Sequence, residues 1–174
     1  LWRWKRLPRS MRQLLRERGV DPQSLREKGG EERLRFLAAE GYRPCEGGVS
    51  AEGVFTAPLD MDRVSNLLTV LGDVRRDEEL NACFLPGLEV YGEGSLVVRG
   101  GNEREVKRRL REARELILRA MGCVECGVCL GRCERGALYL KNGIRVDPER
   151  CIHCKKCLGR CPVLDFSERE EFGF

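Results

Sequence analysis

The sequence predicts an α+β fold, in which an antiparallel sheet unit follows short helices and precedes a cysteine-rich module. Two observations predict it. The middle of the chain alternates short extended runs with two amphipathic helical patterns. Eight of the ten cysteines then follow within residues 123–161. A chain of 174 residues is long enough for two small domains that share a surface.

Residues 1–44 are predicted to be a helical segment or a linker from an upstream domain. Ser10-x-x-Gln13 is a capping-box pattern for a first helix, and Asp21-Pro22 is a typical start for a second. A third short helix is predicted over Glu31–Glu40, ended by Gly41.

Residues 45–121 are predicted to form a small β-α-β-β-β-α unit. After a strand within 47–57, Asp60 caps a helix whose apolar side chains keep to one face up to Gly72. A charged turn then leads into three short strands, Leu80–Leu85, Leu88–Tyr91 and Ser95–Arg99. Asn102, with Glu105 three residues later, caps a longer helix that runs to the first motif cysteine; its predicted apolar stripe is Val106, Leu110, Ala113, Ile117 and Met121.

The cysteines form two identical runs with the spacing C-x2-C-x2-C-x3-C. The first run is Cys123, Cys126, Cys129 and Cys133, and the second is Cys151, Cys154, Cys157 and Cys161. Three thiolates at x2 intervals can close on one cuboidal 4Fe-4S cluster, whereas the fourth cysteine points to the other cluster. Two 4Fe-4S clusters are therefore expected, with crossed ligand sets: Cys123, Cys126, Cys129 and Cys161 for cluster 1, and Cys151, Cys154, Cys157 and Cys133 for cluster 2.

Other residues of this module fit the same prediction. A hairpin with an Asn142-Gly143 turn is expected between the two runs. Three glycines are expected where the backbone approaches sulfide or takes unusual dihedral angles, with backbone N–H groups donating to sulfur: Gly127, Gly131 and Gly159.

These motifs resemble bacterial-type two-cluster ferredoxins over residues of about 120–165. The resemblance implies a ferredoxin-type two-cluster domain, which we place at 122–166, followed by a tail at 167–174. One departure is Glu134 after Cys133, where the family usually has proline, as the second run has at Pro162.

Zinc is the main alternative metal, but zinc ribbons use pairs of C-x2-C motifs rather than two runs of four. Disulfides are disfavoured, because neighbouring thiols stay reduced in a cytoplasm. His153 is interpreted as a solvent-facing residue, with a ligand or proton-donor role as the alternative. Cys45 and Cys83 are interpreted as small buried side chains, with a substrate or persulfide role as the alternative.

Composition narrows the function classes. No uncharged apolar run is long enough for a membrane span, and no leader is recognisable, so we expect a cytoplasmic protein without a membrane partner. No phosphate loop, dinucleotide fingerprint or hydrolase triad occurs, and no catalytic residue is expected. The chain begins Leu1-Trp2-Arg3-Trp4, which suggests the C-terminal part of a longer polypeptide.

The residues flanking the cysteine runs also resemble archaeal phosphoadenosine phosphosulfate reductase-like proteins that carry a ferredoxin domain. The resemblance lies in Arg119–Cys123, Cys151–Cys154 and Cys161–Val163, and in the opening Trp-Arg-Trp. It implies a catalytic domain upstream in the same polypeptide that acts on a sulfur-bearing substrate. No catalytic residue of that domain lies in this chain.

Two functions are consistent with these observations. The first is an electron-transfer module, which relays electrons from a donor through two clusters to an attached or partner redox enzyme. The second is an RNA- or nucleotide-binding module with structural clusters, in which the middle β/α unit and the basic N-terminal segment, with Trp2 and Trp4, contact the ligand. The charged helix at 103–115 mixes acidic and basic residues and is interpreted as a solvated face. A nucleic-acid partner is expected only under the second function.

Overall fold

The computed structural model describes Gln13, Arg16, Glu17, Phe36–Ala38, 41–159, Cys161 and Leu164. Gln13, Arg16 and Glu17 are helical. The rest of the first two predicted helices, the opening tryptophans and the tail lie outside the described residues. The division of the chain into four segments therefore stays a prediction.

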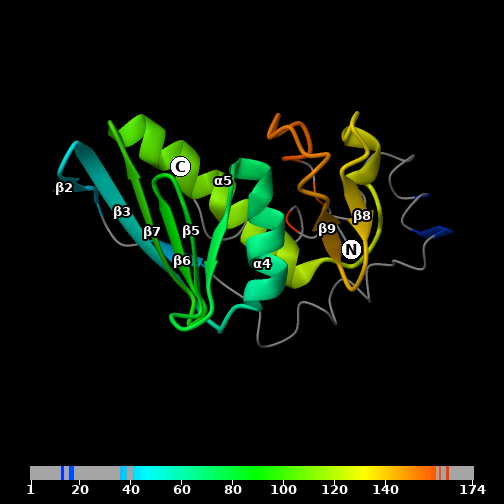
Figure 1. The fold of residues 1–174 in the computed structure, drawn as a ribbon, viewed down its shortest axis with the longest axis horizontal. Helices are drawn as coiled ribbons and strands as arrows, with labels where there is room; N and C mark the ends of the chain where they lie inside the picture. Colours follow the sequence, from blue (N-terminus) through cyan, green and yellow to red (C-terminus); the bar gives the residue numbers. More distant parts are fainter. Residues whose placement is uncertain are drawn as a thin grey trace.

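A seven-stranded antiparallel sheet forms one end of the described structure (Figure 1). Its strand order is β1-β3-β7-β6-β5-β4, and β2 pairs with the other part of β3. The strands are β1 (Phe36–Ala38), β2 (Arg43–Cys45), β3 (Gly48–Phe55), β4 (Arg75–Asp77), β5 (Ala82–Leu85), β6 (Leu88–Tyr91) and β7 (Ser95–Gly100). The mixed α/β class with an antiparallel sheet and two main helices agrees with the sequence prediction.

Strand β1 corrects the third predicted helix. Phe36–Ala38 pairs antiparallel with β3, and Phe36 lies opposite Phe55. The two rings are 4.9 Å apart, and both side chains are almost fully buried. Local helix signals in 31–40 are thus overridden at these three residues by cross-strand packing against a distant aromatic ring.

The first main helix, α4 (Met61–Leu68), begins where the sequence places it. The Asp60 carboxylate accepts a hydrogen bond from the Arg63 amide, as expected of an N-cap. The predicted helix continues to Leu71 only as a 3-10 turn, η1 (Thr69–Leu71). The charged segment that follows is a strand, β4, rather than a turn alone.

The second main helix, α5 (Glu103–Gly122), is capped by Asn102, whose side chain accepts from the Glu105 amide. Glu105 in turn accepts from the Gly101 amide, one residue before the position expected in a capping box. Val106, Ala113 and Ile117 of the predicted stripe are fully buried. Its other members, Leu110 and Met121, pack partly buried against the core.

Helix α4 lies between the sheet and a two-stranded hairpin formed by β8 (Leu138–Leu140) and β9 (Ile144–Val146), as Figure 1 shows. The hairpin agrees with the prediction for this segment. Ile144 and Val146 are buried in the same apolar cluster as the residues that α4 and α5 turn toward the sheet. The sheet unit and the cysteine-rich module therefore share one hydrophobic core, which fixes the module relative to α5.

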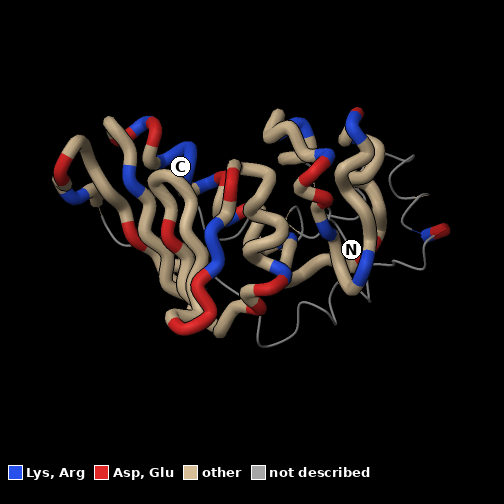
Figure 2. Tube along the Cα trace, viewed as in Figure 1, with Lys and Arg blue, Asp and Glu red and all other residues tan. Residues whose placement is uncertain are grey.

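Acidic and basic residues are interspersed over the described chain, in short runs of either sign (Figure 2). On α5, Arg109 pairs with Glu105 at 2.8 Å, as predicted for a solvated face with i,i+4 pairs. No described helix is both long enough and apolar enough to cross a membrane.

Candidate iron-sulfur site

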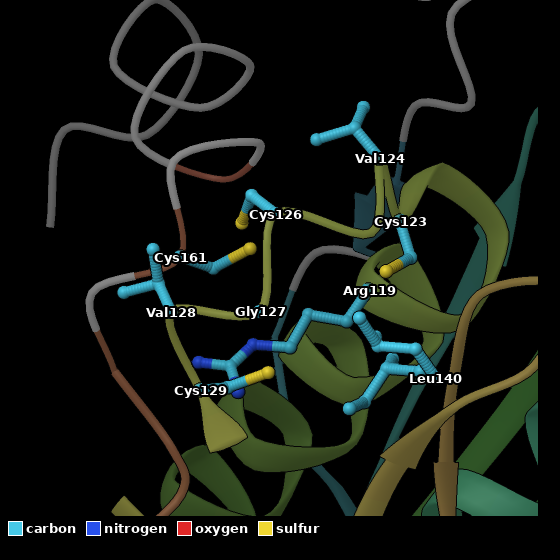
Figure 3. Close-up of a pocket in the computed structure, with 10 residues that line it drawn as sticks. Arg119, Cys123, Val124, Cys126, Gly127, Val128, Cys129, Leu140 and Cys161 are labelled. Atoms are coloured by element: carbon cyan, nitrogen blue, oxygen red, sulfur yellow. The ribbon is translucent and has the colours of Figure 1, made fainter. Parts of the chain in front are cut away.

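Four cysteines of the predicted cluster 1 set line one pocket beyond the C-terminal end of α5 (Figure 3). They are Cys123, Cys126, Cys129 and Cys161. The pocket contains about 390 Å³ of empty space, part of it open to solvent. Val124, Val128, Leu140 and Ile144 supply most of its apolar wall. The fold thus brings the last cysteine of the second run to the first three of the first run.

In the second predicted set, three of the four cysteines lie close to one another. Cys133 and Cys151 both lie close enough to Cys157 for their charges to raise its pKa. Cys157 is buried, whereas Cys154 is exposed. None of the chain's ten cysteines, all of which are described, forms a disulfide, so the disulfide alternative is not realised.

Two of the site thiols are strongly desolvated. Burial raises the pKa of Cys129 to about 11, and it raises the pKa of Cys157 to about 11 as well. In both cases the positive charge of Arg119 acts in the opposite direction and lowers the pKa. Since a thiolate is the form that binds iron, metal binding at these positions must release protons.

The two cysteine runs adopt the same backbone turn. Each residue of the first run has a counterpart 28 residues later, as Cys123 has in Cys151. Glu125 and its counterpart His153 have φ values of 56° and 54°. Gly127 and its counterpart Lys155 have φ values of 72° and 59°.

The hydrogen bonds of the turns repeat as well. The Leu130 amide donates to the Gly127 carbonyl at 3.1 Å, and the Leu158 amide donates to the Lys155 carbonyl at 3.0 Å. Left-handed backbone is uncommon at residues other than glycine. Three of the four positive-φ residues, Glu125, His153 and Lys155, are not glycine. Both runs therefore keep this turn although it is strained for residues with a side chain.

The expected unusual dihedral angles are present at two of the three glycines, whereas the Gly159 amide donates to the Glu115 carboxylate rather than to a sulfur. Gly127 and Gly159 have positive φ values of 72° and 83°. Gly131 lies in the 3-10 turn η2 (Leu130–Arg132) and has no left-handed φ. Backbone donation to cysteine sulfur is present elsewhere: the Ala137 amide donates to the Cys133 sulfur at 3.2 Å, and the Glu125 amide to the Cys123 sulfur at 3.4 Å.

His153 is not solvent-facing, which corrects its main interpretation. It is half-buried, and its Nδ1 lies 2.6 Å from the Thr69 carbonyl oxygen of η1. Because a carbonyl only accepts, Nδ1 carries the proton and donates. The side chain thus ties the second cysteine run to the end of α4.

Outside the cysteine runs, Cys83 is fully buried in β5, and burial raises its pKa to about 11. Cys45 is half-buried in β2. The buried interpretation is therefore confirmed for Cys83. The substrate or persulfide alternative stays a prediction for both residues.

Sequence reasoning missed Arg119 as a site residue. It is 4% exposed and lines the pocket beside the four cysteines. The sequence signal that could have identified it is Glu115, four residues earlier on the same helix. An acidic residue at this spacing can pair with a buried arginine and compensate its charge.

The donor chemistry fits a 4Fe-4S cluster. Four cysteine sulfurs surround an apolar pocket, and backbone amides donate to sulfur nearby. Among the described residues, no group of three or more His, Cys, Asp or Glu side chains could hold a single metal ion. A 4Fe-4S cluster makes a different demand, because each of its four thiolates binds a different iron.

Comparison with known proteins gives one match. The model of the 4Fe-4S binding domain family matches residues 144–164, which include the whole second cysteine run but none of the first. No curated protein and no solved structure matches the chain in these comparisons. The chain therefore contains a 4Fe-4S binding domain at residues 144–164, which supports an iron-sulfur electron-transfer role.

Proposed function

We propose that this chain binds two 4Fe-4S clusters and relays electrons between a donor and an attached or partner redox enzyme. The main support for a second cluster is that both cysteine runs adopt the same backbone turn. The family match covers only the second run, yet the first run has the same cysteine spacing, the same two left-handed positions and the same turn hydrogen bond. Because the two runs share both cysteine spacing and backbone geometry, we expect them to bind the same kind of cluster.

The crossed ligand sets are part of this proposal. Cys129 experiences the charges of Cys161, Cys123 and Cys126, whereas Cys157 experiences those of Cys151 and Cys133. Each of these two groups takes its last cysteine from the other run. Their membership supports Cys123, Cys126, Cys129 and Cys161 as one set, and Cys133, Cys151 and Cys157 as members of the other. Cys154 is assigned to that second set by the cysteine spacing.

The chain's own residues would hold and tune this site. A bound 4Fe-4S cluster supplies one-electron transfer. The cysteine thiolates anchor it, and the apolar side chains around the first pocket limit access of water. Amide donors such as Ala137 N–H place positive dipoles at ligand sulfur, which favours the reduced state.

Partners would approach the second cysteine run. Ile152 is 58% exposed and Cys154 is exposed, whereas Cys126 of the first run is buried. We therefore propose that the electron donor or the acceptor docks at Ile152 and Cys154. A cytoplasmic location is part of the proposal, because reduced thiols are needed to assemble the site.

The proposed acceptor is a phosphoadenosine phosphosulfate reductase-like enzyme of sulfur metabolism, in the same polypeptide or as a partner. Its support is the resemblance of the residues that flank the cysteine runs. Reoxidation of the reduced chain by such an enzyme with its sulfonucleotide, but not by the enzyme alone, is the expected result. Equal reoxidation rates with and without the sulfonucleotide would contradict this acceptor.

The deciding experiment is an analysis of iron and acid-labile sulfide in anaerobically purified protein, with low-temperature EPR before and after dithionite. About eight irons and about eight sulfides per chain, with spectra of two interacting reduced clusters, are expected. About four of each would reduce the proposal to one cluster. Zinc without sulfide, or clusters that dithionite cannot reduce, would contradict electron transfer, and salt-sensitive RNA binding would then favour the alternative module.

A further inference from the structure

Arg119 is a buried charge at the wall of the first pocket. Its side chain runs along the cysteine pocket and ends beside Cys129, as Figure 3 shows. Only 4% of the residue is exposed. A buried guanidinium is costly unless its charge and its donors are satisfied, so each of its contacts needs an explanation.

Two of its three nitrogens have partners. One terminal nitrogen donates to the Cys157 carbonyl at 2.6 Å. The other donates to the Gly159 carbonyl at 2.7 Å and to the Glu115 carboxylate at 2.5 Å. The same Glu115 oxygen accepts from the Gly159 amide at 2.5 Å. Arg119 and Glu115 together therefore hold the second cysteine run against α5.

The third nitrogen does not take part in this network. Arg119 Nε is buried and has no hydrogen-bond partner among the described residues. Leaving a buried donor unsatisfied is unfavourable, because the group has lost its hydrogen bonds to water. It belongs to a side chain that lines the pocket with four cysteine sulfurs. An anionic sulfur group in the pocket is the acceptor that would remove this cost.

Arg119 lies next to both proposed cysteine sets. It lines the pocket together with Cys129 of the first set, and it donates to the Cys157 carbonyl of the second. Glu115 accepts from the Gly159 amide as well as from Arg119, so its carboxylate is shared between two donors.

We propose that Arg119 raises the reduction potential of the cluster held in the first pocket, by directing a buried positive charge and its unpartnered Nε–H at the cluster sulfurs. This inference rests on the proposed function. Reduction transfers one electron from an external one-electron donor to the site, and the site gains one negative charge. Arg119 keeps its proton throughout, because a guanidinium does not deprotonate in proteins. Its attraction is stronger for the more negative state, so the reduced state is favoured.

The test is an EPR-monitored redox titration of the full chain and three variants. Arg119→Met removes the charge and the donor. It is expected to lower the ratio of reduced to oxidised cluster at a fixed poise by about tenfold or more, which is about 59 mV for one electron. Glu115→Gln keeps an oxygen that accepts from Gly159 but removes the negative charge, and it is expected to shift the potential upward. Arg111→Met is the matched control, since it removes an equal charge from an exposed position of the same helix.

Opposite shifts separate electrostatic tuning from a loss of structure, because damage to the shared network would move both variants in one direction. Equal potentials in Arg119→Met and Arg111→Met would overturn the proposal. If Arg119→Met does not retain clusters, Glu115→Gln decides: an upward shift supports the proposal, and a potential equal to that of Arg111→Met overturns it. Absence of iron and sulfide from the unmodified chain would instead contradict the proposed function itself.

Discussion

Asn66 and Val146 exchange two hydrogen bonds across the boundary between the sheet unit and the cysteine-rich module. The Asn66 amide nitrogen donates to the Val146 carbonyl, and the Val146 amide donates to the Asn66 side-chain oxygen, each at 2.9 Å. The side chain thereby occupies the place of a neighbouring strand for β9. A helix residue thus satisfies the backbone of a strand that is 80 residues away.

Asn66→Ala is expected to destabilise the protein by about 1–3 kcal/mol, because both Val146 backbone groups lose their partner while buried. Asn66→Asp should cost less, since it can still accept from the Val146 amide. Urea unfolding followed by circular dichroism gives the free energies. Ser65→Ala is the control, because the Ser65 hydroxyl makes only a 3.5 Å contact with the Asp62 carbonyl. Equal stability of Asn66→Ala and Ser65→Ala would contradict the role of the pair.

The crossed ligand sets predict which cysteine variants share a phenotype. Cys161→Ser should damage the same cluster as Cys123→Ser, although the two residues lie in different runs. Cys133→Ser should likewise match Cys151→Ser. EPR of the reduced variants, with iron content, identifies the cluster that remains. A spectrum of Cys161→Ser that matches Cys151→Ser would show that each run binds its own cluster.

Gly127 and Gly131 should respond differently to alanine. Gly127 has a φ of 72°, and alanine in the left-handed region costs about 1–2 kcal/mol. Gly131 lacks a left-handed φ, and no atom lies within 4 Å of an added Cβ, so alanine there should be neutral or stabilise by about 0.4–1 kcal/mol. Thermal unfolding of the two variants measures the difference. A larger loss in Gly131→Ala than in Gly127→Ala would contradict the turn geometry.

Cys83 is expected to resist alkylation in the folded protein. Burial raises its pKa to about 11, so its thiolate fraction near pH 8 is lower than that of an ordinary thiol by a factor on the order of a hundred. Iodoacetamide labelling with peptide mass spectrometry should show slow modification of Cys83 at pH 8 and rapid modification in urea. Half-buried Cys45 serves as the internal reference. Comparable native rates for the two residues would instead favour a reactive role for Cys83.

The same shift gives a pH dependence of stability. The folded state holds the Cys83 proton more tightly than the unfolded state, so stability is unaffected below pH 9 and falls as the pH rises from about 9 to about 11. The unmodified chain should therefore lose more stability over this range than Cys83→Ala. Parallel pH profiles of the two proteins would show that the thiol does not titrate with folding.

The sequence by itself determined the features that depend on local spacing. Asp60 and Asn102 cap their helices as predicted, because an N-cap needs only a side-chain oxygen and amides three residues away. The hairpin at β8 and β9 and the spacing of the cysteine runs are likewise visible in the chain, and the family match at 144–164 follows from that spacing.

Tertiary structure alone decided the rest, because the relevant partners are far apart in sequence. Phe36 forms a strand because it pairs with Phe55 of β3. His153 is half-buried because its ring donates to the Thr69 carbonyl. In the sequence, Arg119 looks like any other charged residue of α5. In the folded protein it is the buried cation of the cysteine pocket. Its position follows only once α5 packs against the turn at Cys157 and Gly159, where two carbonyls and Glu115 compensate the cost of burying its charge.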